Sequence, residues 1–497
     1  MSAPSPARSD YIPFPLKVVY GLGAFVNNTL AAAIGGMIIV LNLGLGMDPA
    51  WVGMLGALPR LTDALTDPLM GYVSDHTRSR WGRRRPYIFG GAIAAGVLYV
   101  LLWQMPAHWS QTAIFAWFLV GSILFYGAYT VFATPWVALG YELTPDYHER
   151  TRLMGVQNFI GQSAYVVSPW FLWIMTQEDW FESQLEGARA LAVVIAVITI
   201  TLGVLPAVFL RERFSEDDSQ QPDPSVVGPN PLEEVIEVGA SSDPRRRQGL
   251  LHSLLDFLSG LKKTLASGPF LLLGLATFLV FNGFILISSF QYYVIIYYVF
   301  GGDQALGAEY AGYSGTVGAV ATFLVIALVT YLATKIGKKR AFYFTIGVSV
   351  IGYLSKWWCY TPEAPWLLLL PAPLMAFGLG GLFTLMGSMM ADVVDEDELK
   401  THQRREGMFG SIFWWVVKLG MAAAIAGGGF LLNWTGFDVE LGGQQSASAL
   451  YWMRVCDAFI PAGTSLIAIA AVAWYPIDET KAAATRAQLE ARRGSSS

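Results

Sequence analysis

Twelve apolar runs dominate this 497-residue chain and constrain its fold more than any other feature. A helix needs ~20 apolar residues to cross the hydrocarbon core of a bilayer, and each run is long enough. The chain is 54% hydrophobic and 14% charged, which excludes an ordinary soluble domain. The sequence therefore predicts an all-α membrane protein with twelve transmembrane helices. We expect the spans at residues 17–41, 50–74, 86–105, 112–140, 153–176, 188–210, 269–298, 310–334, 341–360, 366–392, 407–433 and 449–475.

Basic residues indicate the orientation of these spans. Apart from Lys17, the first residue of the first span, only five of the 32 Lys and Arg residues fall within the spans or on the side opposite the termini: Arg60, Arg189, Lys356, Lys418 and Arg454. The others cluster at residues 78–85, 150–152, 211–263, 335–340 and 400–405 and in the two tails. An even number of spans places both termini on one side, and the positive-inside rule makes that side cytoplasmic. We expect a multi-pass protein of the bacterial cytoplasmic (inner) membrane whose N-terminus carries no cleaved signal.

A polar, proline-containing segment at residues 211–268 divides the spans into six and six. Within it, residues 250–265 have apolar side chains at helical spacing, which predicts an amphipathic helix on the membrane surface or on the protein. We expect a cytoplasmic N-tail (1–16), an N-terminal six-helix bundle (17–210), this cytoplasmic linker (211–268), a C-terminal six-helix bundle (269–475) and a cytoplasmic C-tail (476–497).

Two loop motifs recur in the two halves. The run WGRRR at 81–85 follows the second span, and IGKKR at 336–340 follows the eighth, 255 residues later. An acidic-then-basic loop that ends in Gly155 recurs as one that ends in Gly407, 252 residues later. Two unrelated loops with nearly the same offset predict two six-helix pseudo-repeats, the major facilitator fold, with a central cavity between the halves.

The second span carries Arg60, Asp63 and Asp67 at membrane depth. Each charge costs at least ~2.5–3.5 kcal/mol there, which favours a functional role. The three side chains are about one turn apart and face one direction, and Pro68 leaves the carbonyl of Ala64 without its helical donor. Carboxylate and carbonyl oxygens suit a small hard cation. The alternative is a salt-bridge cluster that only locks helices together.

These residues resemble those of a known family, the glycoside-pentoside-hexuronide:cation symporters, a melibiose-permease-like branch of the major facilitator superfamily. The similarity extends from about residue 19 to residue 476. It is carried by YGLGAF at 20–25, DALTDPLMG at 63–71, GYVSDHTRSRWGRRR at 71–85 and ADVVDEDELKTHQRREG at 391–407.

The resemblance implies a binding site for Na⁺ or H⁺. It assigns cation binding to Asp63, Thr66, Asp67 and Thr130, with Na⁺ expected at Asp63 and Asp67, and charge compensation to Arg60 and Lys418. Position 66 is usually an amide in the family, so its hydroxyl here makes proton coupling more plausible. The alternative for Lys418 is a plain salt bridge.

The expected substrate site departs from the family. Asn28, Ala133 and Asn158 stand where the family has charged residues, which puts galactoside recognition in doubt. Aromatic and amide side chains suit a sugar ring and suit a more amphiphilic solute equally, although each aromatic taken singly is more often a packing residue. The expected pocket residues are Asn27, Asn28, Tyr129, Trp136, Gln157, Asn158, Phe413 and Trp414.

Charged loop residues are expected to latch the cytoplasmic ends of the halves in one state of a transport cycle. These gate residues are Asp75, Arg83, Arg84, Glu142, Arg152, Asp392, Arg404 and Arg405. Every histidine falls in a loop or the linker, and no Gly-rich phosphate loop follows a strand, so we expect no enzymatic activity and no cofactor. We interpret Cys359 and Cys456 as packing residues.

The resemblance implies import of a glycoside, pentoside or hexuronide by a monomeric transporter, driven by Na⁺ or H⁺ and without nucleic-acid partners. Three alternatives stay open. In the first, the transported solute would be a lysolipid-like amphiphile. In the second, the protein would sense a solute without transporting it. In the third, it would export drugs in exchange for protons.

Overall fold

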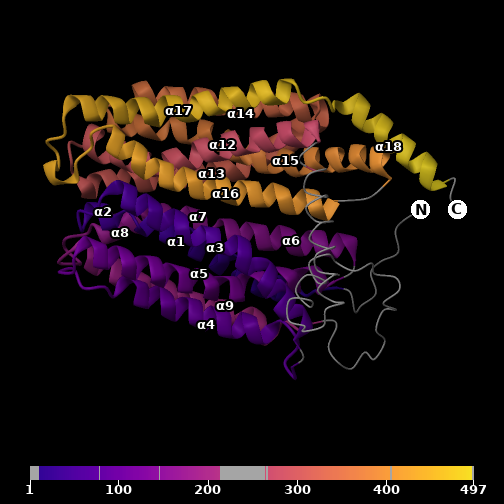
Figure 1. Ribbon diagram of the computed structural model, residues 1–497, viewed down its shortest axis with the longest axis horizontal. Coiled ribbons are helices and arrows are strands. Elements are labelled where there is room, and N and C mark those ends of the chain that lie inside the picture. The colour runs from indigo at the N-terminus through magenta and orange to yellow at the C-terminus, as the bar shows by residue number, and fades with distance from the viewer. Residues whose placement is uncertain are drawn as a thin grey trace, which may run out of the picture.

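The computed structural model describes residues 11–77, 79–144, 146–212, 264, 267–402 and 406–494, and all regular structure in this part of the chain is helical. The helices form two bundles that lie side by side with roughly parallel long axes (Figure 1). We call the end of the bundles at which α18 (Glu479–Gly494) lies the terminal end, and the opposite one the far end. The prediction of an all-α fold with two six-helix halves is confirmed.

The first bundle contains six spans, of which the fifth is broken into short pieces. Its elements are α1 (Phe14–Met37), α2 (Val40–Leu43), α3 (Pro49–His76), α4 (Arg85–Trp103), α5 (Gln111–Glu142), α6 (Tyr147–Gln162), α7 (Ala164–Val167), η1 (Ser168–Trp170), α8 (Phe171–Met175) and α9 (Gln184–Phe209).

The second bundle repeats this order. Its elements are α12 (Gly268–Tyr293), η2 (Val294–Val299), α13 (Gln304–Ile336), α14 (Lys338–Cys359), η3 (Pro365–Leu369), α15 (Pro371–Thr401), α16 (Glu406–Trp434), η4 (Val439–Leu441) and α17 (Ala447–Ala473). A further helix, α18 (Glu479–Gly494), follows at the terminal end.

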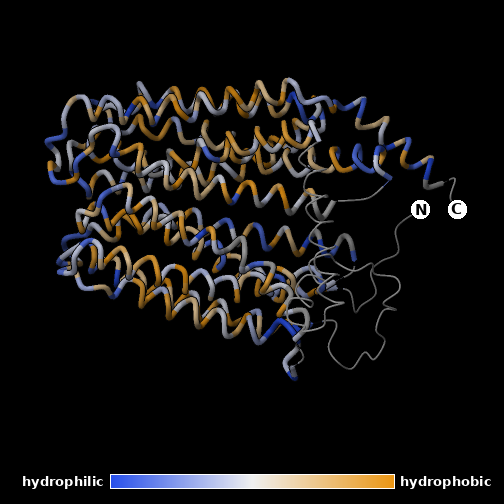
Figure 2. The backbone as a smooth tube through the Cα atoms, in the orientation of Figure 1, coloured by the Kyte–Doolittle hydropathy of each residue, from blue (hydrophilic) through white to orange (hydrophobic). Residues whose placement is uncertain are grey.

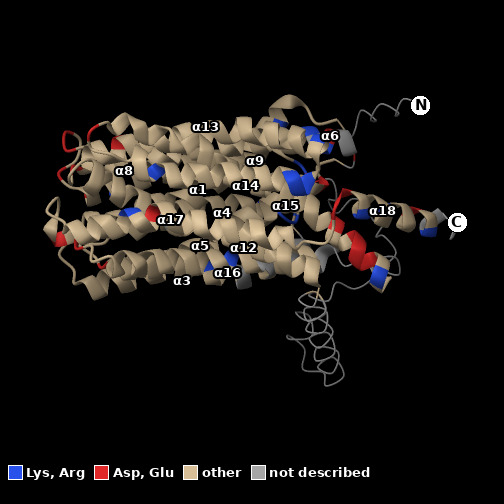
Figure 3. Cartoon of the chain, turned by 90° about the horizontal axis from the view of Figure 1, so that it is seen from above, with Lys and Arg blue, Asp and Glu red and all other residues tan. Residues whose placement is uncertain are grey.

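Hydrophobic residues cover the length of both bundles, and polar residues gather at the two ends (Figure 2). Within the described residues, nine helices are long and apolar enough to cross a membrane. α3 is not among them, although it has 28 residues, because it carries Arg60, Asp63 and Asp67. Most charged residues lie at the ends of the bundles, and a few lie inside them (Figure 3).

The pseudo-repeat is visible in individual contacts. Arg84 Nη1 binds the carboxylate of Glu142 at 2.7 Å and the carbonyl of Ala138 at 2.9 Å. In the second half, Lys338 Nζ binds Asp392 at 2.6 Å and the carbonyl of Ser388 at 3.0 Å. In both halves a basic residue at the start of the third span therefore ties this span to the terminal end of the fourth.

Glycines shape the loops before these contacts. Gly82 and Gly337 have φ angles of 99° and 81°, in the left-handed region that other residues rarely adopt. A Cβ at Gly82 would also lie 2.5 Å from a carboxylate oxygen of Glu212. That carboxylate accepts the backbone N–H groups of Arg83, Arg84 and Arg85 at 2.8 to 3.0 Å, so Glu212 satisfies the donors at the start of α4.

The two halves are joined at the far end. The hydroxyl of Tyr293 donates to Asn42 Oδ1 at 2.9 Å in a buried contact, and Asn433 Nδ2 donates to Asp48 Oδ1 at 2.8 Å. The indole N–H of Trp170 donates to Thr316 Oγ1 at 2.9 Å. At the terminal end, the ion pairs recorded between described residues stay within one half or involve α18.

Two expectations for the polar segments have different outcomes. The amphipathic helix expected at 250–265 lies outside the described residues, apart from Thr264. The region expected as the C-tail, 476–497, contains α18, whose Lys481 lies 3.0 Å from Glu396 and whose Leu489 is buried. The sequence did not predict this helix, because its buried positions include only one large apolar residue, Leu489, which is too little for a recognisable hydrophobic face.

Candidate functional site

The centre of the site is the carboxylate of Asp67 in α3. Thr130 of α5 donates its hydroxyl to Asp67 Oδ1 at 3.0 Å, and the ammonium of Lys418 in α16 pairs with Asp67 Oδ2. The hydroxyl oxygens of Thr66 and Thr130 are 3.3 Å apart. Four of the residues expected from the sequence, Thr66, Asp67, Thr130 and Lys418, therefore meet at one place, and Lys418 comes from the other half.

The local sequence of α3 explains how these groups are positioned. Asp48 caps the helix by accepting the N–H of Ala50 at 2.7 Å, and Pro49 occupies its first position, where no N–H is needed. Further along, Thr62 and Thr66 donate their hydroxyls to the carbonyls of Pro59 and Thr62 at 2.5 and 3.1 Å. Hydroxyls thus satisfy backbone oxygens in the stretch that carries the charges.

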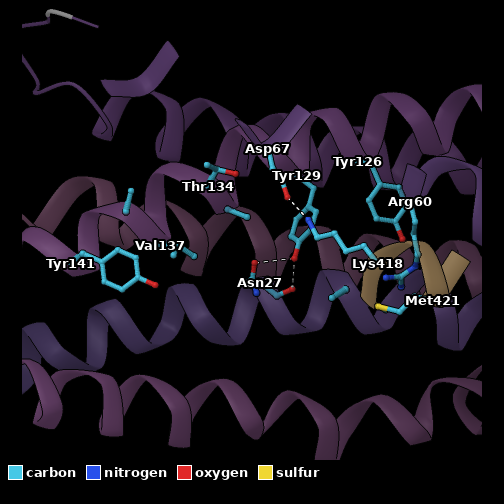
Figure 4. A pocket seen from close by; sticks show the side chains of 13 residues that line it. Asn27, Arg60, Asp67, Tyr126, Tyr129, Thr134, Val137, Tyr141, Lys418 and Met421 are labelled. Carbon is cyan, nitrogen blue, oxygen red and sulfur yellow. Dashed lines mark hydrogen bonds and ion pairs between the residues drawn. The ribbon is translucent and has the colours of Figure 1, made fainter. Parts of the chain in front are cut away.

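A cavity of about 520 Å³ opens beside Asp67. Its wall includes Arg60, Tyr126 and Met421 toward one end and Val137 and Tyr141 toward the other (Figure 4). Tyr141 is the penultimate residue of α5 and lies at the terminal end. The cavity therefore extends from the level of the charged cluster toward the terminal end.

Polar groups of α1 and α5 line the same cavity. The hydroxyl of Tyr129 donates to Asn27 Oδ1 at 2.9 Å, and Asn27 Nδ2 donates to Asn28 Oδ1 at 3.2 Å. Asn27 and Tyr129 both border the cavity, as expected from the sequence. Three further polar residues, Tyr126, Thr134 and Tyr141, border the cavity although the sequence did not indicate them.

Other residues expected at the substrate site do not border this cavity. Trp136 is buried, stacks on Tyr20 with 5.1 Å between ring centroids, and donates its N–H to the Tyr20 carbonyl. Trp414 is half exposed and contacts Phe413. On α6, Gln157 is half-buried, and the exposed Asn158 has its amide oxygen 3.5 Å from Gln162 Nε2.

Some expected residues cannot be placed in full. Asp63 lies one turn before Asp67 on the α3 backbone and Asp75 lies in its last turn, but both side chains are outside the described part of the structure. Arg404 and Arg405 lie outside the described residues altogether. Their expected roles stay predictions.

The described gate residues pair within their own halves. Arg83 and Arg84 both bind Glu142, at 2.5 and 2.7 Å. Asp392 binds Lys338 at 2.6 Å and lies 3.5 Å from Arg486 of α18. In this conformation, no ion pair between described gate residues joins the two halves.

A buried pair that the sequence did not indicate lies near the start of α6. Lys17 Nζ is 2.6 Å from Glu149, which also accepts the N–H of Ile12 at 3.0 Å and faces Arg152 at 3.4 Å. Burial alone would raise the pKa of Glu149, but the hydrogen bonds from Lys17 and Ile12 and the charge of Lys17 hold it below its usual value. Glu149 therefore fixes the start of α1 to the start of α6 at the terminal end of the first half.

Comparisons with known proteins agree with this fold. The sequence model of the family described as MFS/sugar transport protein matches residues 19–238 and 240–479. An uncharacterized symporter of Synechocystis is 26% identical over 98% of both chains. A glucuronide carrier protein homolog of Escherichia coli is 22% identical over 93% of both chains, and an isoprimeverose transporter of Lactiplantibacillus pentosus is 23% identical over 95% of this chain and 90% of its own.

Among solved structures, a bacterial homolog of the human lysosomal transporter Spinster, in an inward-facing and unoccupied conformation, superimposes with a TM-score of 0.60. It shares 16% sequence identity over 96% of each chain, which supports the fold alone. The family match covers nearly all of the chain, including both halves and the residues around Asp67. The chain therefore belongs to the MFS/sugar transport family of major facilitators, in agreement with its resemblance to the glycoside-pentoside-hexuronide:cation symporters.

Proposed function

We propose that this protein is a secondary active transporter that imports a sugar or glycoside in symport with Na⁺ or H⁺ by alternating access. The observation that carries the proposal is the ion pair between Asp67 and Lys418, which joins α3 of one half to α16 of the other beside the cavity. A carboxylate at this position costs energy unless a cationic group pairs with it. Whether Lys418 or a coupling cation binds Asp67 therefore influences how the halves are arranged.

Coupling follows from competition for one carboxylate. A cation that binds Asp67, with Thr66 and Thr130 as further oxygen ligands, displaces the ammonium of Lys418 and weakens the contact between the halves. A ligand shifts a conformational equilibrium only through its differential affinity for the two states. Cation binding here would have such a differential effect, because Lys418 belongs to the opposite half.

The arrangement of contacts supports an inward-facing state. Hydrogen bonds join the halves at the far end, whereas the cavity extends toward the terminal end. We propose that both termini are cytoplasmic and that the protein lies in the cytoplasmic membrane of a bacterium, as the distribution of basic residues predicts.

The size and lining of the cavity fit a small polar solute. Its volume of about 520 Å³ lies within the ~300–1,000 Å³ range of small-molecule sites. Asn27 and Tyr129 supply hydrogen-bonding groups, and Tyr126 supplies an aromatic surface. The family match and the names of the glucuronide and isoprimeverose relatives point to the same class of substrate.

The test is uptake into proteoliposomes of labelled glycosides, pentosides and hexuronides under an imposed Na⁺ or H⁺ gradient. We expect one sugar class to accumulate above its equilibrium level under one of the two gradients. Solute binding without flux would indicate a sensor, and flux that only dissipates a solute gradient would contradict symport.

A second candidate substrate is a lysolipid-like amphiphile. One observation favours it: apolar side chains of Ala133, Val137 and Ala138 line the cavity between the charged cluster and Tyr141. Competition of lysolipids with free sugars for uptake separates the two candidates. Inhibition by lysolipids alone would favour the amphiphile.

A further inference from the structure

Three charged side chains border the cavity among the described residues. Two cationic side chains, Arg60 and Lys418, border the cavity together with the carboxylate of Asp67. Asp67 is already bound by Lys418 and Thr130. Arg60 makes no ion pair with a carboxylate among the described side chains, and its guanidinium lies 5.9 Å from the ring centre of Tyr126.

A coupling cation would give this cluster an excess positive charge. In sequence, the cluster comprises the cations Arg60 and Lys418 and the carboxylates Asp63 and Asp67, so the charges balance when both carboxylates are ionised. A bound Na⁺ or H⁺ then leaves one excess positive charge at membrane depth, which is unfavourable without a counter-ion. A neutral sugar offers no such counter-ion, whereas an anionic solute does.

The position of Arg60 suits this role. In Figure 4, Arg60 lies beside Tyr126 and Met421 at one end of the cavity, and Tyr141 lies at the other. A guanidinium presents a planar fork of donors that matches the two oxygens of a carboxylate or phosphate. A solute whose anionic group meets Arg60 would place its remaining part alongside Tyr129 and Val137.

We infer that the transported solute carries an anionic group and that Arg60 binds this group at the inner end of the cavity. The inference rests on the proposed transport function and narrows its substrate. The same chemistry has two sources, the carboxylate of a uronide and the phosphate of a lysophospholipid, and the experiment distinguishes them.

The first arm uses the unmodified protein in proteoliposomes. Cation-driven uptake of p-nitrophenyl β-D-glucuronide is compared with that of p-nitrophenyl β-D-glucoside, which differs only in having a hydroxymethyl group in place of the carboxylate. Lysophosphatidate is compared in the same way with the corresponding monoacylglycerol. We expect the anionic member of one pair to be preferred by about 10- to 100-fold, the range for a hydrogen bond to a charged group.

The second arm changes Arg60. Arg60→Gln should lower that selectivity ratio by about 10- to 100-fold, and Arg60→Lys should retain part of it because the charge remains. Arg340→Gln, an exposed arginine at the terminal end, is the matched control and should leave the ratio as in the unmodified protein.

The outcomes separate this inference from the proposed function. Accumulation of the neutral glucoside in preference to the glucuronide would overturn the inference and leave sugar transport standing. Preference for lysophosphatidate with no sugar uptake would support an anionic solute and contradict sugar transport. An unchanged selectivity ratio in Arg60→Gln would overturn the role of Arg60. If that variant does not fold, the preference of the unmodified protein decides the question.

Discussion

Lys418 of α16 and Asp67 of α3 form an ion pair across the two halves of the bundle, 351 residues apart in the sequence. Thr130 holds the other oxygen of the same carboxylate. A cation at Asp67 and the ammonium of Lys418 therefore compete for one group, and this competition links ion binding to the relative position of the halves.

Removing Lys418 should strengthen cation binding. In Lys418→Gln the competing ammonium is lost, so the apparent affinity for the coupling cation should rise about 2- to 10-fold. The expected change is modest because the two side chains are 38% and 36% exposed, and solvent screens the pair. The measurement is the cation dependence of intrinsic tryptophan fluorescence, and an unchanged affinity would mean that the pair is only a structural salt bridge.

Thr130 distinguishes the two coupling ions. Thr130→Val removes both the donor to Asp67 and an oxygen ligand, whereas Thr130→Ser keeps the hydroxyl. If Na⁺ is the coupling ion, Thr130→Val should lower its affinity about 3- to 10-fold and Thr130→Ser should change it little. Na⁺ titrations of uptake measure this, and equal Na⁺ dependence in both variants would argue against a sodium site that uses this hydroxyl.

The contact between Tyr293 and Asn42 should stabilise closure of the far end. Tyr293→Phe leaves the buried oxygen of Asn42 without its donor, which costs on the order of 1 kcal/mol and should shift the population toward far-end opening about 5-fold. An impermeant thiol reagent applied from the far side to Ala31→Cys, with Cys359 and Cys456 replaced, reports the shift.

Tyr331→Phe, which alters an exposed tyrosine on α13, is the control for this shift and should label like its parent. Equal labelling rates in the Tyr293→Phe and Tyr331→Phe proteins would show that the Asn42 contact does not hold the far end closed.

Acidification should weaken the terminal end through Glu149. The pKa of its carboxyl is lower in the folded protein than in the unfolded chain, so its stabilising contribution is complete above the ordinary glutamate pKa. That contribution is lost as the pH falls through the lowered value. Lowering the pH from neutral to well below the ordinary glutamate pKa should therefore reduce the thermal stability of the unmodified protein in detergent more than that of Glu149→Gln. An equal loss of thermal stability on acidification in both proteins would contradict this role of Glu149.

Much of the fold follows from the sequence because a bilayer imposes a length on each span. The expected span 50–74 agrees with α3, since Pro49 starts the helix and the apolar run continues past the charges. The expected span 153–176 corresponds instead to several short helices, because Pro169 and neighbouring serines interrupt the regular pattern. α18 was missed because its inward face has a single large apolar residue, Leu489, and is otherwise held by ion pairs such as that between Lys481 and Glu396.

The part of the candidate site that could be predicted from the sequence is the set of charged residues carried by a single helix. The spacing of Arg60, Asp63 and Asp67 is visible in the sequence, because charges in an apolar run are costly. Which aromatic residues face the cavity is not visible, because periodicity does not say which neighbour a helix face meets. For example, Trp136 was expected at the cavity but packs on Tyr20, whereas Tyr126 was not expected there but lines the cavity. Contacts such as Tyr293 with Asn42 join positions 251 residues apart and carry no sequence signal.

Cation coupling through the aspartates of α3 is the central claim, and gradient-driven accumulation tests it most directly. Asp63→Asn and Asp67→Asn are reconstituted beside the unmodified protein and Asp179→Asn, which alters an exposed loop aspartate. We predict that the unmodified protein and Asp179→Asn accumulate the solute above equilibrium, whereas both α3 variants reach the membrane folded and fail to accumulate it. Undiminished accumulation by Asp63→Asn would contradict the assignment of the cation site.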